Sequence, residues 1–334
     1  MKDNYAAWHI NANEFSGNWS DLQKLQFFGH YAVLAPSGHN TQPWQFSHAG
    51  NSLLLKVNSK RQLPFSGKIA GEPYVSLGAC LETLRIAAQG FGYTINVDYS
   101  FSAEAVATIT LSNKTMADPS LLDAITNRVS NRYFYDKAPL AQDVLDTITG
   151  TDLTDVHVQA FTNVDDIKFL ADQTQTATLK IFHESKFREE LSKWVRNNLT
   201  KQYDGMPGFA QKIPTPPSLI AKLLIKNVDI SKDQAQKDTA LVLNSPAIVL
   251  VAVKKITDRA FLNGGGAFAR VCILAQQHGL ATSGVGAAII DPETRKIVAR
   301  HFGLDYQPIA LVRIGKTTVT PRHTPRWPFE KVSG

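Results

Sequence analysis

Two segments that lie far apart in this sequence share one pattern of small and apolar residues. Leu77-Gly78-Ala79 opens a helical pattern that ends at Gln89, and Gly265-Gly266-Ala267 opens another that ends at Gln277. Each pattern follows an apolar strand-like run and precedes a glycine and a strand-like segment. We interpret the pair as an internal repeat whose small residues, at the helix starts, allow close backbone approach. Chance similarity between two amphipathic helices is the alternative.

The patterns around these landmarks predict a mixture of helices and strands. Helices are expected over 21–35, 73–90, 119–127, 139–149 and 265–278, and strands over 44–47, 53–57, 94–101, 107–111, 156–161, 247–253 and 309–314. The run 247–253 is continuously apolar, which is typical of a strand at the centre of a sheet. Because helices and strands do not strictly alternate, their order favours an α+β fold over a doubly wound sheet.

Length and the repeat divide the chain into two expected halves. Its 334 residues would fill two domains of ordinary size. We expect an N-terminal half over 1–116 and a C-terminal half over 117–334. Residues 183–238 fit neither half, because they combine a charged helix with stretches rich in proline and glycine. Long insertions of this kind usually have a function or are mobile, so we interpret this one as a lid, with a plain structural extension as the alternative.

Composition limits the classes of partner. Hydrophobic residues make up 43% and charged residues 19% of the chain, which is typical of a globular protein. The net charge of +6 is spread along the chain, so it slightly favours small anionic ligands and gives no sign of nucleic acid. No apolar run reaches the roughly 18 residues of a membrane span, and no leader-like segment follows Met1. We therefore expect a cytoplasmic protein without a membrane partner, with Cys80 and Cys272 as buried thiols.

Several common catalytic motifs are absent from the sequence. The nine histidines form no HExxH or HxH pair and the two cysteines have no metal-ligand spacing, so no metal site is expected. The glycine clusters 264–266 and 284–286 lack the strand–turn–helix junction of a dinucleotide-binding loop. Ser283 does not lie in a GxSxG elbow. No side chain is therefore assigned as catalytic.

Two other stretches have the composition of a ligand site. Arg128, Ser130 and Arg132 alternate, so in an extended segment their side chains share one face and can donate to a phosphate and to carbonyl oxygens. By itself the triplet is a weak signal that a solvated surface turn explains more simply. Residues 35–44, APSGHNTQPW, form a loop of small and amide residues that could grip a planar polar ligand, with a capping turn as the alternative. Near the end of the sequence, Arg322 and Arg326 add positive charge to a proline-stiffened segment.

Together these stretches resemble the nitroreductase superfamily. Residues 35–44 match the family's APSxxNxQPW loop, 128–132 its RxSxR signature, 279–287 its glycine-containing flavin loop, and 325–328 its C-terminal phosphate-binding arginine segment. In ordinary members RxSxR precedes the APS loop, and the flavin lies between two subunits. Here the order is reversed, as in the fused Acg-like subfamily. The resemblance implies a nitroreductase-like fold of two fused halves, an intrachain pseudo-dimer with one complete site.

The resemblance also implies the cofactor and its ligands. The cofactor would be flavin mononucleotide (FMN), with Arg128, Ser130 and Arg326 on its phosphate and Arg132 at the pyrimidine edge of the ring. The backbone at Val285 and Gly286 would offer an N–H near N5, where hydride arrives, and the flavin itself would carry the redox chemistry. Residues expected to line the opposite side, from the first half, are Pro36, Ser37, Gly38, Asn40 and Gln42.

A function follows from the same resemblance. It implies a ping-pong reductase in which NADH or NADPH reduces the flavin and a nitroaromatic, quinone or similar small molecule takes the electrons. Two alternatives stay open: a protein that holds FMN under a closed insertion with little turnover, and an enzyme that destroys the flavin ring. A monomeric pseudo-dimer would suffice for one site, and a homodimer stays open as well.

Overall fold

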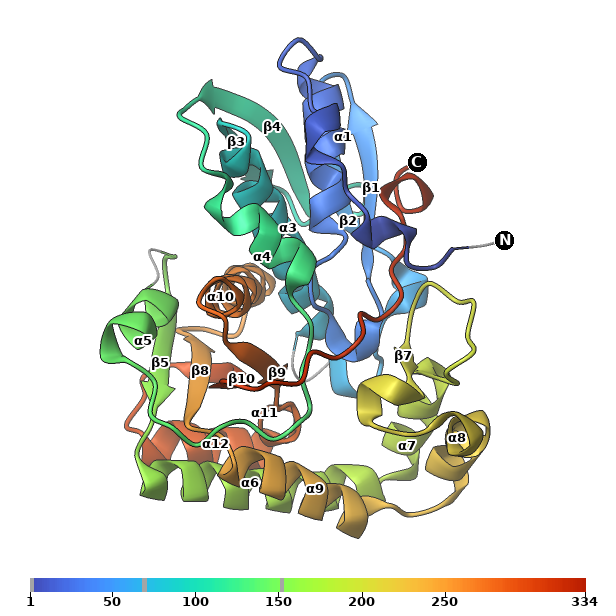
Figure 1. Ribbon diagram of the computed structural model, residues 1–334, viewed down its shortest axis with the longest axis vertical. Coiled ribbons are helices and arrows are strands. Elements are labelled where there is room, and N and C mark those ends of the chain that lie inside the picture. The colour runs from blue at the N-terminus through green and yellow to red at the C-terminus, as the bar shows by residue number, and fades with distance from the viewer. Residues whose placement is uncertain (1–2, 68–70, 151–152) are drawn as a thin grey trace.

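The computed structural model describes residues 3–67, 71–150 and 153–334, and its framework is two four-stranded sheets, one from each half of the sequence (Figure 1). Every neighbouring pair of strands in both sheets is antiparallel. The first sheet has the order β1-β2-β4-β3, with β1 (Trp44–Ala49), β2 (Ser52–Val57), β3 (Tyr93–Tyr99) and β4 (Ala107–Lys114). The second has the order β5-β8-β10-β9, with β5 (Val156–Phe161), β8 (Ala247–Val253), β9 (Ala281–Gly284) and β10 (Gln307–Gly315). The expected α+β class is confirmed.

The two sheets repeat one topology. In each, the first two strands are neighbours, a long helix follows, and the last strand lies between the second and the third. The long helix is α3 (Glu72–Gly90) in the first half and α10 (Asp258–Gln277) in the second. The two similar helical patterns, residues 77–89 and 265–277, therefore occupy equivalent places in the two halves.

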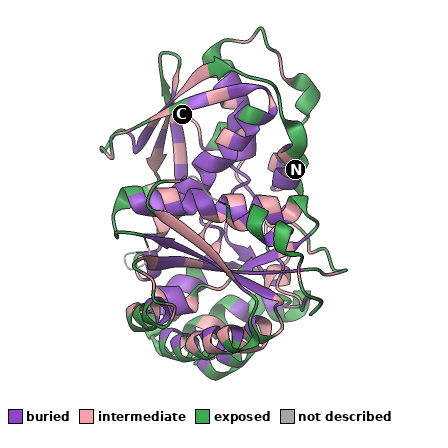
Figure 2. Cartoon of the chain, turned by 90° about the vertical axis from the view of Figure 1, so that its left-hand side faces the viewer, coloured by how far each residue is buried: buried purple, intermediate pink, exposed green. Residues whose placement is uncertain are grey.

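Helices α3 and α10 pack against each other between the sheets (Figure 1). A side chain at Gly78 would overlap the carbonyl oxygen of Leu262, and one at Gly265 would overlap the carbonyl oxygen of Val75. Each contacted residue lies three positions before the glycine of its own helix (78 − 75 and 265 − 262), so the two contacts are reciprocal. Figure 2 shows how strongly burial is concentrated in these helices and in the strands beside them.

Both glycine patterns lie inside their helices, so the prediction that they open them was wrong. Helix α3 begins at Glu72, and α10 begins at Asp258 after Thr257, whose side chain accepts a hydrogen bond from the Ala260 N–H. Glycine is normally disfavoured in helix interiors. The close approach of two helices explains why glycine is nevertheless required there.

Other elements follow local chemistry. Helix α1 (Asp21–Ala32) begins with a capping box between Ser20 and Gln23, and every residue of β8 is buried, as its apolar run predicts. Helix α5 (Gln142–Thr149) begins later than the predicted start at Pro139. The predicted 119–127 helix is a short 3-10 turn (Pro119–Leu121) continued by α4 (Leu122–Asn127). Helices α6 (Val164–His183), α9 (Ser231–Leu243), α11 (Ala287–Ile290) and α12 (Pro292–His301) cover the second sheet (Figure 1).

Most of the 183–238 insertion forms a lobe beside the first half, whereas its last residues begin α9, which covers the second sheet (Figure 1). It contains α7 (Ser185–Trp194), the short parallel pair β6 (Val195–Arg196) and β7 (Met206–Pro207), a 3-10 turn over Gly208–Gln211, and α8 (Thr215–Asn227). The last part of the sequence then crosses back from β10 to the first sheet. There the Phe46 N–H donates to the Val332 carbonyl at 2.7 Å, and the Gly334 N–H donates to the Phe46 carbonyl at 3.1 Å. This terminal segment therefore extends the edge of the other half's sheet.

Candidate functional site

A cavity lies where four separate stretches of the chain meet: the 35–44 loop, the segment after α4, the 183–238 lobe and the terminal segment. Seven of the eleven expected site residues line it, namely Pro36, Ser37, Asn40, Arg128, Ser130, Arg132 and Arg326. Asn40 and the two arginines of the RxSxR stretch thus line the same cavity although they are far apart in the sequence. The expected meeting of these stretches occurs.

The loop that enters the cavity has an uncommon backbone. His39, Asn40 and Gln42 all have positive φ angles, of 48°, 57° and 53°. Side-chain-bearing residues rarely adopt this region, and such strain persists only where the surroundings hold it. Two contacts do so: the Gly38 N–H donates to Glu72 Oε1 at 2.8 Å, and the Gln42 N–H donates to Ser37 Oγ at 3.0 Å. The Gly38 amide is therefore bound within the protein, and Gly38 itself does not line the cavity.

Positive charge dominates the cavity. Arg128, Arg132, Arg322 and Arg326 line it, and no aspartate or glutamate is among its lining residues in the described part of the chain. Burial lowers the pKa of Arg128, Arg132 and Arg326, and the nearby charge of Arg128 lowers the pKa of Arg326 further. Buried cations without a matching anion are costly. The cavity is therefore suited to a bound anion.

The guanidinium groups are only partly used by the protein. Arg326 donates through Nη1 to Asn40 Oδ1 at 2.5 Å and Thr324 Oγ1 at 2.6 Å, while its buried Nε has no partner in the described structure. Arg128 Nη2 donates to the Leu34 carbonyl at 3.0 Å. An arginine has five N–H donors, so these bonds fix the orientation of each group and leave donors for a ligand. An oxyanion such as phosphate fits this donor set.

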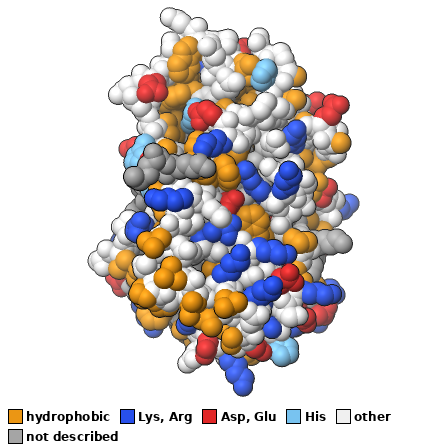
Figure 3. Space-filling view, turned by 90° about the vertical axis from the view of Figure 1, so that its right-hand side faces the viewer, with side chains coloured by type: hydrophobic (Ala, Val, Ile, Leu, Met, Phe, Trp, Pro, Cys, Tyr) orange, Lys and Arg blue, Asp and Glu red, His pale blue; other side chains and the backbone are white. Residues whose placement is uncertain are grey.

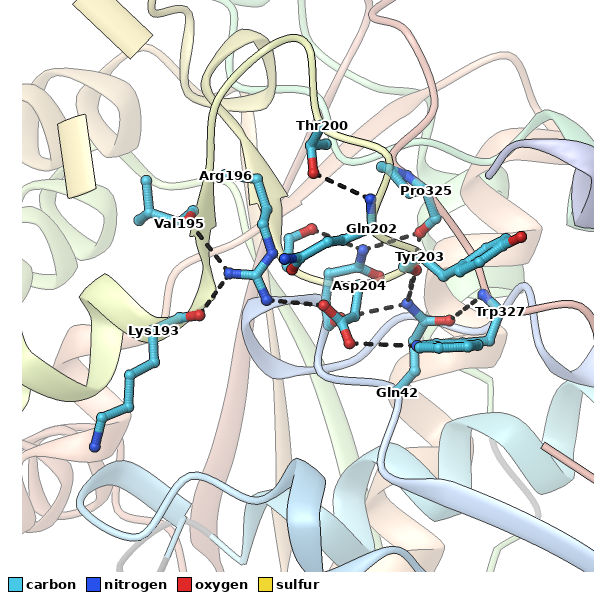
Figure 4. A network of polar contacts seen from close by, with 12 residues as sticks. Gln42, Lys193, Val195, Arg196, Thr200, Gln202, Tyr203, Asp204, Pro325 and Trp327 are labelled. Atoms are coloured by element: carbon cyan, nitrogen blue, oxygen red, sulfur yellow. Dashed lines mark hydrogen bonds and ion pairs between the residues drawn. The ribbon is translucent and has the colours of Figure 1, made fainter. Parts of the chain in front are cut away.

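The two amide side chains of the loop bind protein groups instead of lying free. Asn40 Nδ2 donates to the Gly205 carbonyl at 2.8 Å and to the Pro325 carbonyl at 3.0 Å. Gln42 Nε2 donates to the Tyr203 carbonyl at 2.7 Å, and Gln42 Oε1 accepts from the Trp327 N–H at 2.9 Å (Figure 4). Gln42 does not line the cavity, which corrects its expected place. Its amide joins the lobe to the terminal segment.

Asp204 strengthens the same junction. Its Oδ1 accepts from Arg196 Nη2 at 2.8 Å and its Oδ2 from Trp327 Nε1 at 3.3 Å (Figure 4). The loop, the lobe and the terminal segment are thus held by one polar network beside the cavity.

The expected backbone donor at Val285 and Gly286 requires a correction. The Val285 N–H donates to the Leu311 carbonyl at 2.8 Å, so it is part of the second half's own framework. Neither residue lines the cavity.

Sequence reasoning missed several wall residues. His39 occupies a variable position of the loop motif; burial and the adjacent Arg132 charge lower its pKa to about 4, and its buried Nδ1 has no partner in the described structure. Trp8 stacks on His323 with a centroid separation of 4.0 Å, and Arg326 lies over the Trp8 ring at 5.0 Å. Met206 and Ala210 come from the 183–238 lobe. The order of these residues in the sequence carries no periodic signal that would place them together.

Comparisons with known proteins agree with the resemblance in the sequence. No family model matches the chain. The Mycobacterium tuberculosis H37Rv protein named "Putative NAD(P)H nitroreductase acg" is 25% identical over 330 residues, covering 90% of this chain and 92% of that protein. A second protein of that strain, also named a putative NAD(P)H nitroreductase, is 24% identical over 310 residues, covering 90% of this chain and 88% of that protein.

Among solved structures, similarity is partial. A nitroreductase with bound FMN from Desulfitobacterium hafniense aligns with a TM-score of 0.40 and 14% identity over 63% of this chain and 95% of that chain. One from Bacteroides fragilis, also with bound FMN, aligns with a TM-score of 0.37 and 16% identity over 59% of this chain and 88% of that chain.

Proposed function

We propose that this chain, which is similar in sequence to the putative nitroreductase Acg, is a nitroreductase-superfamily protein that binds FMN in the arginine-lined cavity and acts as an NAD(P)H-dependent flavin oxidoreductase. The observation that carries this proposal is the excess of buried guanidinium groups, with an unpartnered Arg326 Nε and no carboxylate in the wall. A phosphorylated ring cofactor would supply the missing negative charge.

Each wall residue then has a distinct task. Arg128, Ser130 and Arg326 hold the phosphate, with Arg326 oriented by Asn40. Arg132 places its charge beside the ring edge, fixed by its Nη1 bond to the Ala210 carbonyl at 3.1 Å. Pro36 and Ser37 supply the facing wall from the first half.

When bound, the flavin supplies hydride and electron transfer between a nicotinamide and a small acceptor such as a nitroaromatic or quinone. The protein residues contribute orientation and electrostatics. The positive charge of Arg132 and burial keep His39 neutral at physiological pH, so its Nδ1 is able to accept or donate one hydrogen bond at the cavity. The lobe contributes Met206 and Ala210 to the wall of the cavity.

A second candidate function is favoured by the same lobe. Met206 and Ala210 form part of the wall and Gly205 is bonded to Asn40, so the lobe closes one side of the site. A protein that retains FMN and turns over slowly would have this arrangement.

The central experiment separates the two functions. Purified protein is examined for flavin absorbance, released by heat, and is then mixed with NADH or NADPH in a stopped-flow instrument. Bound FMN that bleaches rapidly supports the reductase. Bound FMN that bleaches with neither nicotinamide supports the retaining protein, and protein that neither carries nor takes up FMN refutes both.

We also propose that the two halves, 1–116 and 117–334, arose by duplication, with the complete site kept once. The equal strand orders and the reciprocal contacts of Gly78 and Gly265 support this origin. A single chain would then provide what two subunits provide in an ordinary family member.

A further inference from the structure

Helix α8 exposes an unusually apolar surface. Four apolar residues on neighbouring turns of its outer face are exposed, namely Leu219 (56%), Ile220 (53%), Leu223 (65%) and Leu224 (44%). Val228, just beyond the helix, is 47% exposed. Leu199 of the same lobe is 67% exposed. Isolated exposed apolar residues are ordinary, but a run on one helix face marks an interaction surface.

The inner face of the same helix is already packed. Ser218 and Ala221 are buried, and Ile225 contacts the cluster that contains Met206. At 100° per residue, these three positions lie opposite the face that carries Leu219, Ile220 and Leu223. Helix α8 is therefore apolar on two opposite faces, although only one is covered by the protein.

Charge indicates what covers the outer face. Between residues 212 and 228 the sequence has three lysines, Lys212, Lys222 and Lys226, all exposed, and no aspartate or glutamate. Lys222 and Lys226 flank the apolar face on one side, where long side chains can reach past an apolar boundary to bind anionic groups. Figure 3 shows hydrophobic side chains gathered among lysine and arginine side chains on the lower part of this face of the molecule.

We propose that α8 docks this protein onto an anionic lipid surface, with Leu219, Ile220, Leu223 and Leu224 entering the acyl boundary. An apolar helix face bordered by lysines is the arrangement that lies in the interface plane of a bilayer. No helix in the described part of the chain could cross a membrane, so the contact is peripheral. The proposal departs from the sequence-based expectation of no membrane partner.

A second copy of the chain is the less suitable occupant. A two-fold contact through α8 would bring Lys222 and Lys226 of both copies close together, with no acidic residue on the helix to compensate. Lipid phosphates would neutralise the same lysines. The proposal is independent of the flavin, and its test uses no flavin chemistry.

The test is flotation of the full chain with vesicles of phosphatidylcholine alone or mixed with phosphatidylglycerol. Wild-type protein should float only with the mixed vesicles. Leu223→Glu/Leu224→Glu should reduce binding by about tenfold or more, since the pair loses apolar insertion and gains repulsion. The matched control is Val164→Glu/Ile297→Glu, two residues on α6 and α12 that are 65% and 41% exposed and should keep wild-type binding.

A second set of variants separates electrostatic attraction to anionic lipid from non-specific hydrophobic adsorption. Lys222→Gln/Lys226→Gln should weaken binding by about fivefold for each lysine, and added salt should do the same. Lys168→Gln/Lys296→Gln, at exposed lysines of α6 and α12, serves as the control. Thermal melting checks that all variants are folded.

Three outcomes would overturn the proposal. These are wild-type protein that floats with neither vesicle, α8 variants that bind as well as their controls, and light scattering that shows a dimer dispersed by Leu223→Glu/Leu224→Glu. The last outcome would show that α8 forms an interface between two copies of the chain.

Discussion

Gly78 of α3 lies directly against the carbonyl oxygen of Leu262 on α10, and no side chain fits between them. The reciprocal contact of Gly265 with Val75 makes this crossing the tightest junction between the two halves. Because backbone atoms cannot move aside as a flexible side chain can, substitutions at the two glycines test the junction directly.

Gly265→Ala should therefore destabilise the protein strongly. The new methyl group meets the Val75 backbone, and overpacking of this kind costs about 1–3 kcal/mol or more. Gly266→Ala is the neighbouring control, because its Cβ would lie 3.6 Å from the nearest side-chain atoms, which is ordinary contact. That variant should match or exceed wild-type stability, since alanine is favoured in helices by about 0.5–1 kcal/mol. Unfolding of both variants in denaturant measures the difference. Equal unfolding midpoints for Gly265→Ala and Gly266→Ala would contradict the close contact between α3 and α10.

Arg128→Ala should weaken FMN binding by about 1.5–3 kcal/mol, roughly 10- to 150-fold, the effect of losing one hydrogen bond to a charged group. Titration of flavin-free protein with FMN measures it. Arg313→Ala is the matched control, because Arg313 is buried, has an unpartnered Nη1 in the described structure, and does not line the cavity. If Arg128→Ala binds FMN as tightly as Arg313→Ala does, the phosphate assignment fails.

Gln42→Leu should loosen the lobe. The change removes the side-chain hydrogen bonds of Gln42 and leaves the Tyr203 carbonyl and the Trp327 N–H without this partner. The lost bonds correspond to about 1–3 kcal/mol, so trypsin cleavage after the exposed Lys201 should become roughly 5- to 150-fold faster. Gln89→Leu, at an exposed position of α3, should cleave like wild type.

The same variant distinguishes the two proposed functions. If the lobe limits access of the nicotinamide to the cavity, FMN bound to the Gln42→Leu variant will be bleached by NAD(P)H faster than FMN bound to wild type. An unchanged bleaching rate beside accelerated cleavage would show that the lobe does not control access.

Glu72→Gln should change how stability depends on pH. Burial of the carboxyl group, whose Oε2 has no partner in the described structure, raises the pKa of Glu72 from 4.5 to about 7. Between these values the folded state binds a proton that the unfolded state has lost, so wild-type stability falls as pH rises from about 4.5 to 7. Glutamine stays neutral at every pH. The variant's free energy of unfolding should therefore rise relative to wild type across this window, by up to roughly 3 kcal/mol, and should equal it below about pH 4.5.

His39 and His323 act in the opposite direction and overlap that window. Their pKa values are lowered to about 4, mainly by burial, so they make stability rise between about pH 4 and 6.5. The difference between wild type and Glu72→Gln at each pH, from urea unfolding, removes this shared contribution. A difference that stays constant from pH 4 to 8 would falsify the raised pKa.

The sequence predicted those parts of the site that rest on local motifs. Pro36, Ser37, Asn40, Arg128 and Arg326 belong to compact motifs, and they line one cavity. What the sequence did not predict depends on distant partners. Gln42 matches the motif, yet its bonds go to residues 203 and 327, which no periodicity connects to it.

Other errors also arose from tertiary contacts. The Val285 amide looked available because its acceptor, Leu311, lies on another strand. Similarly, the repeat placed the glycines of α3 and α10 at helix starts, whereas they lie inside the helices, where the expected close backbone approach occurs.

The strand-like pairing of residues 332–334 with Phe46 has a consequence for biosynthesis. Arg326 and the edge of the first sheet are supplied by residues that the ribosome makes after both sheets. Phe329 and Val332 of the terminal segment also belong to the first half's hydrophobic core, so both that core and the cavity stay unfinished until nearly all of the described chain has left the exit tunnel. Cofactor capture would then come late in maturation, and a premature stop shortly before residue 326 would remove Arg326 from the cavity together with the core contacts of Phe329 and Val332.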